Sequence, residues 1–145
     1  MRTPTLLAAL LAAGLTLAAT SRTAPQDDEP TPLQAAMQEM MGGQRAMRRL
    51  VRDPAANVEG LVAAASAIQR GALAAYSLPP AAPEGEDPHR WRIGYQRQIL
   101  RLLDTALECE LAARAGDAEL LKAAYARLGE IKAEGHDTYQ VDERP

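Results

Sequence analysis

The sequence predicts an all-α protein, an antiparallel up-down-up-down four-helix bundle. Apolar residues recur at three- and four-residue steps in four long stretches, which is the spacing of helices with one buried face. Proline, glycine and aspartate mark the short or moderate connections, and the alternation of apolar and polar residues typical of strands is absent throughout. Amphipathic helices of about twenty residues joined in this way favour a bundle.

Residues 1–30 precede the predicted bundle. Arg2 and the apolar run at 6–19 are typical of a secretory signal, and the run is too short to span a bilayer comfortably. We expect a signal peptide at 1–21, with cleavage only approximately placed, and a polar, proline-bearing flexible leader at 22–30. The chain is therefore predicted to be periplasmic, with no membrane anchor after signal cleavage.

The first predicted helix begins at Thr31 and runs to about Arg52. Thr31 can cap it, Pro32 suits the first helical position, and Gln34 completes a capping box. Its last turns carry a cluster of cations, which oppose the negative end of the helix dipole: Arg45, Arg48, Arg49 and Arg52. Stabilisation is the simplest interpretation of this cluster, and a docking patch for an acidic partner is the alternative.

The second predicted helix begins at Asp53-Pro54, which repeats the signal of a cap followed by proline. Its apolar positions keep helical spacing: Val58, Leu61, Val62, Ala65, Ile68, Ala72 and Leu73. The segment 77–80, which contains a double proline, ends it, and 81–86 forms the one long loop of the bundle.

The third predicted helix begins at Asp87-Pro88 and runs to Arg114. Its apolar positions are Trp91, Tyr95, Ile99, Leu102, Leu103, Ala106, Leu107 and Leu111. Gly116 turns the chain and Asp117 can cap the fourth helix, which extends to Tyr139. The bundle domain is accordingly placed at 31–141, with a tail at 142–145.

Composition limits the classes of function. The net charge is −3 and becomes −4 once 1–21 is removed, so nothing indicates nucleic-acid binding. The single cysteine, Cys109, excludes an internal disulfide and is predicted to be a small packing residue, with a redox or intermolecular role as the alternative. Phosphate loops, nucleophile elbows and zinc-protease motifs are missing from the sequence, so we predict that the protein is not an enzyme.

Two possible metal-binding side chains are predicted to meet inside the bundle. A face of the first helix carries Leu33, Met37, Met40, Gln44 and Met47. On the fourth helix, His136 lies near the angular sector of Leu121, Tyr125, Leu128 and Tyr139, at the edge of the apolar stripe. In an antiparallel bundle, Met37 and His136 occupy the same end. The other histidine, His89, is predicted to be an exposed polar residue.

These residues resemble the cytochrome b562 family, small exported four-helix bundles that hold haem b between a methionine on the first helix and a histidine near the end of the fourth. Leu33, Met37 and Met40 reproduce the family's opening pattern, and His136 precedes Tyr139 by three residues, as the ligand histidine does in the family. The double proline after the second helix and the aromatic pair Trp91 and Tyr95 also match.

The resemblance implies a periplasmic electron-transfer protein with one non-covalent haem b, whose iron has Met37 and His136 as axial ligands. Met40 and Met41 remain reserve ligands. The other cofactor-binding residues implied are Leu33, Met40, Gln44, Trp91, Tyr95, Leu128, Lys132 and Tyr139. The expected partner is a redox protein that the sequence does not identify, and the expected state is a monomer or a weak dimer.

The chain departs from the pattern of the family it resembles at Gln140, at Gly135 and in the first helix, which carries about two extra residues before the second, so that Met40 and Met41 stay reserve ligands. The related cytochrome c-prime bundles attach haem through Cys-x-x-Cys-His, but Lys132 and Gly135 occupy the cysteine positions before His136, so no thioether bond can form. Gln140 stands where a basic residue is expected after the tyrosine. Gly135 also replaces a larger residue and is expected to loosen the end of the helix.

Three alternatives stay open. Loss of the methionine bond would leave a five-coordinate haem able to bind small gases. A haem-free periplasmic bundle could use its methionines as packing residues or as soft ligands for cuprous ion, acting as a metal-binding or protein-interaction module. A secreted chaperone or stress sensor could use the arginine cluster of the first helix.

Overall fold

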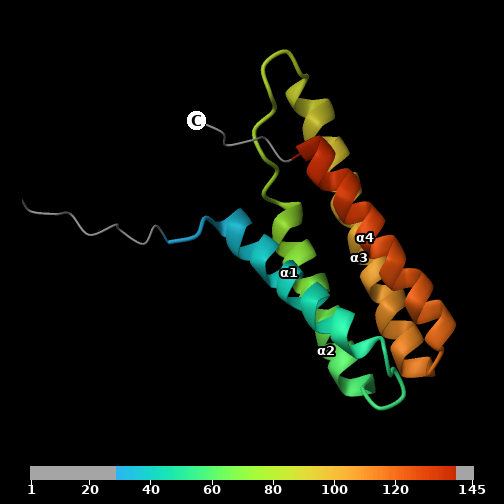
Figure 1. Ribbon diagram of the computed structural model, residues 1–145. Coiled ribbons are helices and arrows are strands. Elements are labelled where there is room, and N and C mark those ends of the chain that lie inside the picture. Colours follow the sequence, from blue (N-terminus) through green and yellow to red (C-terminus); the bar gives the residue numbers. More distant parts are fainter. Residues whose placement is uncertain (1–28, 140–145) are drawn as a thin grey trace, which may run out of the picture.

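The computed structural model describes residues 29–139, which form four α-helices. They are α1 (Pro32–Leu50), α2 (Val58–Tyr76), α3 (Pro88–Ala115) and α4 (Ala118–Tyr139), and no strand occurs among them (Figure 1). The predicted all-α four-helix fold is confirmed. The signal peptide at 1–21, most of the leader at 22–30 and the tail at 142–145 lie outside the described residues.

Close approaches between α1 and α2 show that these helices are antiparallel. Gly71 of α2 faces the start of α1, where an added Cβ would lie 2.7 Å from the backbone oxygen of Ala36 and 2.6 Å from Met40 Cγ. At the other end of the pair, Gly60 faces Leu50. Residues early in α1 therefore contact residues late in α2, and residues late in α1 contact residues early in α2, so the two helices run in opposite directions.

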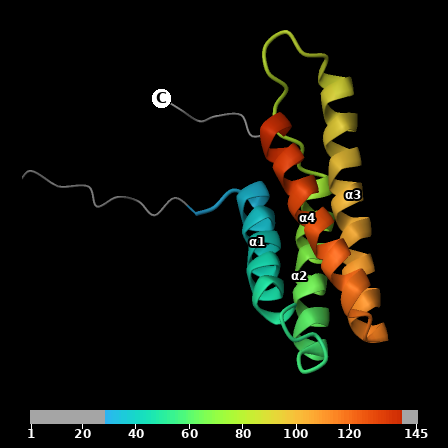
Figure 2. The ribbon, with the colours of Figure 1, turned by 45° about the vertical axis from the view of Figure 1, so that its right-hand side comes forward.

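The next two pairs reverse in the same way. Tyr95 Oη donates a hydrogen bond to the backbone oxygen of Ala75 (3.1 Å), and Gln69 of α2 reaches Glu110 farther along α3. Between α3 and α4, Gln98 Nε2 donates to the oxygen of Ile131 (2.7 Å). The chain therefore passes down α1, up α2, down α3 and up α4 (Figures 1 and 2).

The predicted caps of three helices are present. Thr31 forms the capping box with Gln34. Asp87 accepts from the backbone N–H of Arg90 at 2.7 Å, and Asp117 accepts from that of Leu120 at 2.9 Å. Each carboxylate satisfies a donor that the first turn of a helix leaves unpaired.

The connection between α1 and α2 differs from the prediction. The first helix ends at Leu50 rather than near Arg52, and α2 begins at Val58 rather than at Asp53-Pro54. Pro54 accepts from the N–H of Asn57 (3.1 Å), and Asp53 accepts from the side-chain amide of Asn57 (2.7 Å). The segment around Asp53-Pro54 thus forms a single hydrogen-bonded turn, and α2 begins only after it, at Val58.

The core lies along the middle of the bundle and consists mainly of alanine and leucine-sized side chains. Met47, Leu61, Ile68, Cys109, Leu121 and Leu128 are fully buried within it. Cys109 is a packing residue, as predicted. Part of the predicted apolar set lies outside the core, because Leu73, Leu107 and Leu111 are each about half exposed or more. Within residues 29–139, none of the helices combines the length and the apolarity that a membrane span requires.

Candidate functional site

The seam between α1 and α4 is the open side of the bundle. Consecutive helices pack closely, but no Cα atom of α1 lies within 8 Å of a Cα atom of α4. A hollow of about 390 Å³ occupies this seam, lined by Gln44 of α1 and by Tyr125, Ala126, Gly129 and Lys132 of α4. Its volume falls within the range of about 300–1,000 Å³ that is usual for ligand pockets.

The face of α4 that lines the hollow continues to His136. Tyr125, Gly129 and Lys132 are separated by four and three residues, so they share one face of the helix. His136 follows Lys132 by four residues and lies on the same face, in the last turn. The imidazole is therefore placed on the seam, at the end of α4, where its side chain is exposed.

The corresponding face of α1 carries Met37. Gln44 lines the hollow, and Met37 precedes it by seven residues, two helical turns. Met37 and Leu33 are half-buried and pack against the edge of the core. Leu33, Met37 and Gln44 thus form a half-buried stripe along the seam.

The structure separates Met37 from the other methionines of α1. Met40 points at α2, where its Cγ would meet a Cβ at Gly71, and it is only 6% exposed. Met47 is fully buried in the core. Met41 is half-buried and lies about 60° around the helix from Gln44. Met37, about 20° from Gln44, is therefore the methionine whose direction is nearest to that of the residue lining the hollow.

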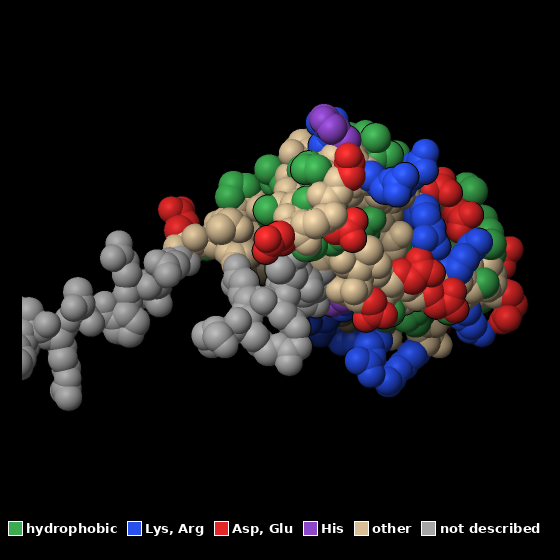
Figure 3. All heavy atoms as spheres, turned by 90° about the horizontal axis from the view of Figure 1, so that it is seen from above, with side chains coloured by type: hydrophobic (Ala, Val, Ile, Leu, Met, Phe, Trp, Pro, Cys, Tyr) green, Lys and Arg blue, Asp and Glu red, His purple; other side chains and the backbone are tan. Residues whose placement is uncertain are grey.

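The start of α1 and the end of α4 lie at the same end of the molecule (Figures 1 and 2). Met37, in the second turn of α1, and His136, in the last turn of α4, are consequently at the same end of the seam. Viewed from this end, the surface shows interspersed acidic and basic side chains and exposed histidine (Figure 3).

Three aromatic side chains form a cluster close to this end. The ring of Tyr139 contacts Trp91 and Tyr95 edge to face, with centroid distances of 4.8 and 5.6 Å. Trp91 Nε1 donates to the backbone oxygen of Pro80 (3.1 Å), and burial raises the pKa of Tyr95 to about 12. Tyr139 is half-buried, and its pKa is also raised by burial. The cluster fixes the end of α4 against α3 and the double-proline segment.

The last turns of α4 are held to α3 by polar contacts as well. Arg101 Nη1 and Glu134 Oε2 form an ion pair at 2.6 Å. The hydrogen bond from Arg101, followed by that from Gln98, lowers the pKa of the Glu134 carboxyl. Gly135 does not interrupt the helix, which continues to Tyr139. The backbone that carries His136 is thus tied to α3 by side-chain contacts.

Most of the sequence-predicted residues converge on this end of the bundle or on the seam. Gln44 and Lys132 line the hollow, and the aromatic trio forms one cluster. Two predicted residues point elsewhere, since Met40 packs on α2 and Leu128 is fully buried in the core.

Sequence reasoning missed Tyr125, Ala126 and Gly129 as lining residues of the hollow. The signal for two of them was present, because Tyr125 and Gly129 precede Lys132 at helical spacing. The seam itself could not be found in that way, since spacing shows which residues share a face and not how far apart two helices lie.

Among residues 29–139, no group of three or more histidine, cysteine, aspartate or glutamate side chains could hold a metal ion. Methionine is not one of these four residue types. Comparisons with protein-family models, with curated proteins and with solved structures found no match to this chain. The case for a function therefore rests on the chain's own residues and their placement.

Proposed function

We propose that this protein transfers single electrons and holds one non-covalent haem b in the seam between α1 and α4, with Met37 and His136 as axial ligands. The observation that carries the proposal is the coincidence of the open seam with these two residues. Each lies on a helix face that borders the hollow, and both lie at the same end of the bundle.

The donor set fits haem iron. A thioether and a neutral imidazole on opposite walls of a seam could approach an iron from opposite sides, and this pair raises its reduction potential relative to stronger donors. Only one histidine is needed for such a site, so it requires no cluster of acidic or cysteine ligands. The lack of a Cys-x-x-Cys-His motif makes the binding non-covalent.

The walls of the seam also suit a flat, apolar group with acidic edges. Leu33, Met37 and Tyr125 supply half-buried apolar surface, and Gly129 leaves space on the α4 side. Lys132, which lines the hollow, offers a cation for a carboxylate. The remaining pocket residues, Trp91, Tyr95 and Tyr139, would hold α4 in place close to the histidine.

Electron transfer follows from this arrangement because it needs a held redox group near the surface and no substrate pocket. Bound haem b would supply a one-electron iron couple. The chain's own contribution is to fix two ligands on helices that are braced by α2 and α3, and this limits rearrangement between oxidation states. The proposed location is the periplasm, and the proposed partner is another redox protein.

The test is a titration of the purified protein with haemin, followed by visible spectra before and after dithionite reduction. We expect sharp α and β bands of six-coordinate low-spin haem in the reduced protein. His136→Ala should abolish this spectrum, and Met37→Ala should convert it to a high-spin form, with circular dichroism showing that each variant is folded.

Two matched controls sharpen the assignment. His89→Ala removes the other histidine, which is exposed at the start of α3, and Met41→Ala removes a half-buried methionine that lies farther around α1 from Gln44 than Met37 does. Both should bind haem as the parent does. An unchanged spectrum in His136→Ala would refute the proposal, and loss of the bands in Met41→Ala in place of Met37→Ala would refute the ligand assignment.

The haem-free alternative predicts a different outcome of the same titration. No specific Soret shift by a folded parent protein would favour a binding or structural bundle. Carbon monoxide binding to the reduced protein without displacement of a ligand would favour the five-coordinate, gas-binding version.

A further inference from the structure

An apolar surface covers the side of the bundle formed by α2 and α3. Its residues are Leu73 and Tyr76 of α2 and Ile93, Leu100, Leu103, Leu107 and Leu111 of α3, which we call the α2/α3 apolar face. Leu73 and Leu111 are more than 60% exposed, and Leu100 and Leu107 about half exposed. Exposed apolar side chains gathered on one side of a molecule mark an interaction site more often than scattered single residues do.

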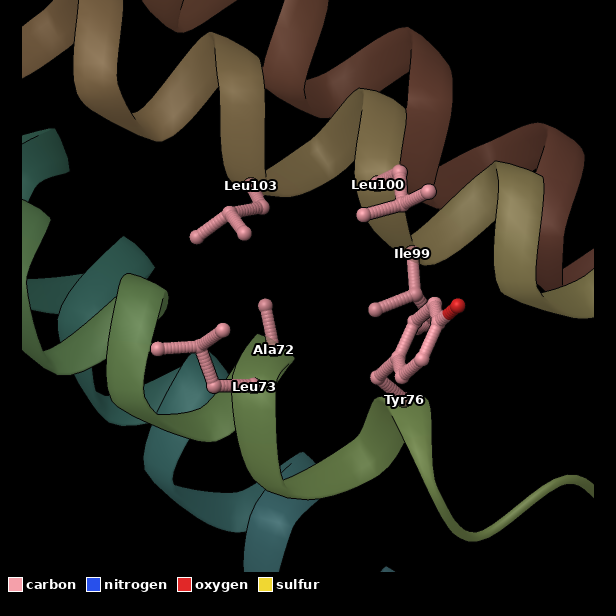
Figure 4. Close-up of a pocket in the computed structure, with 6 residues that line it drawn as sticks. All are labelled: Ala72, Leu73, Tyr76, Ile99, Leu100 and Leu103. Atoms are coloured by element: carbon pink, nitrogen blue, oxygen red, sulfur yellow. The ribbon is translucent and has the colours of Figure 1, made fainter.

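The face contains a shallow groove. A hollow of about 150 Å³ lies between α2 and α3, lined by Ala72, Leu73, Tyr76, Ile99, Leu100 and Leu103 (Figure 4). Side chains from the two helices point toward each other across it, and every lining residue is apolar or aromatic. Such a groove suits an aliphatic side chain projecting from another protein surface.

The outer face of α3 combines this apolar surface with two opposite charges. Ile93, Leu100, Leu107 and Leu111 follow one another at helical spacing, and Arg97 and Asp104 lie between them on the same face. Arg97 and Asp104 are both exposed, and neither forms an ion pair with another described residue. They are seven residues apart, about 10 Å along the helix, which is too far to pair with each other.

We infer that the α2/α3 apolar face binds a second copy of this chain, with the two α3 helices packed antiparallel about a two-fold axis. An axis midway between residues 97 and 104 sets Arg97 of each copy opposite Asp104 of the other. Because the interface is two-fold symmetric, the ion pair between Arg97 and Asp104 occurs twice, as every contact does in an isologous interface.

The same register matches the apolar residues. Ile93 of one copy falls at the level of Glu108 of the other, between Leu107 and Leu111 along the helix, and the two Leu100 side chains lie close to the axis. The apolar stripe from residue 93 to residue 111 is about 27 Å long, which is long enough for helix-to-helix packing. A face that is complementary to itself in charge, with apolar residues on both sides of the axis, selects a second copy over an unrelated partner.

This interface would leave the haem seam free. The helices contact one another in the order α1, α2, α3, α4, so the α2/α3 side lies across the bundle from the α1/α4 seam (Figure 2). The association is independent of the proposed haem site.

The test is sedimentation velocity of the purified protein over a concentration series, with and without substitutions at the charged pair. We expect reversible dimers. Arg97→Asp or Asp104→Arg should weaken dimerisation about tenfold or more, because each substitution creates two like-charge contacts. The double variant, Arg97→Asp with Asp104→Arg, should restore it, since the opposite charges are merely exchanged.

Two further variants complete the design. Arg45→Glu reverses a charge on an exposed arginine of α1 and should leave the dimer unchanged. Leu100→Lys should give a folded monomer, because the side chain is about half exposed in the single bundle. A monomer at every concentration, a dimer insensitive to Leu100→Lys, or a double variant as weak as the single ones would each overturn the inference.

Discussion

At the residue scale, the close packing of α1 on α2 depends on whether a glycine faces the neighbouring helix or the solvent. Gly42 and Gly43 are neighbours on α1, but only Gly43 faces α2. A Cβ at Gly43 would lie 2.7 Å from the backbone oxygen of Ala64 and equally close to Ile68 Cγ1, whereas a Cβ at Gly42 would have nothing within 4 Å. Two identical residues therefore have opposite roles.

This contrast predicts opposite effects of the same substitution. Gly42→Ala should raise the free energy of unfolding by up to about 1 kcal/mol, because alanine favours the helix over glycine. Gly43→Ala should lower it by about 1–3 kcal/mol, since the helices must move apart. Urea denaturation of the two variants checks this, and equal effects would contradict the close approach of α1 to α2.

Cys109 illustrates how burial controls reactivity. The side chain is fully buried, and burial is the main cause that raises the pKa of the thiol to about 12, with a smaller contribution from the charge of Glu108. Only the thiolate is strongly nucleophilic. The folded protein should keep this group protonated and shielded.

We expect Cys109 to react slowly with iodoacetamide in the native protein and rapidly in denaturant. The unfolded chain supplies the control, because its thiol has an ordinary pKa of about 8.5. Mass spectrometry of the alkylated protein over time gives the rates. Rapid native labelling would show that α3 opens locally or that the thiol is accessible.

At the element scale, polar contacts at the helix surfaces supplement the apolar core. Glu110 of α3 accepts from Gln69 of α2 at 2.7 Å and from Arg114 one turn along its own helix at 2.7 Å. These hydrogen bonds, the one from Gln69 first, lower the pKa of the Glu110 carboxyl. The carboxylate therefore links α2 to α3 while it is ionised.

The lowered pKa of Glu110 predicts an acid-dependent loss of stability. Because the folded pKa lies below the unfolded value, the contribution is complete above about pH 4.3 and disappears as the pH falls through the folded pKa. Glu110→Gln should reduce the fall in Tm between about pH 6 and pH 3. Thermal unfolding followed by circular dichroism measures this, with Glu130→Gln as an exposed control on α4. Identical acid profiles for parent and Glu110→Gln would argue against this link.

At the scale of the whole molecule, the bundle has two sides of different character. The α1/α4 seam is open and carries the Met37 and His136 faces, whereas the α2/α3 side is closely packed and exposes leucine outward. The haemin titration tests the proposed haem site in the α1/α4 seam, and sedimentation tests the proposed dimer interface on the α2/α3 side. The two proposals are independent, so either can hold if the other fails.

The sequence by itself determined the number of helices, most of their boundaries and the caps of α1, α3 and α4. Thr31, Asp87 and Asp117 act locally, since each bonds to a backbone N–H three residues away. Periodicity also placed Met37 and His136 on their respective helix faces. The start of α2 was predicted too early, because Asp53-Pro54 is as consistent with a single closed turn as with a continuing helix.

Only the tertiary structure decided how the helices lie against one another. Periodicity shows which residues share a face, but the separation of two faces depends on side chains from other helices. Glycines allow α1 to approach α2 closely and Tyr139 packs the end of α4 against α3, whereas no Cα atom of α1 comes within 8 Å of one of α4. For the same reason Leu73, Leu107 and Leu111 could not be separated from the core by sequence alone, since an apolar stripe does not show whether a neighbouring helix covers it.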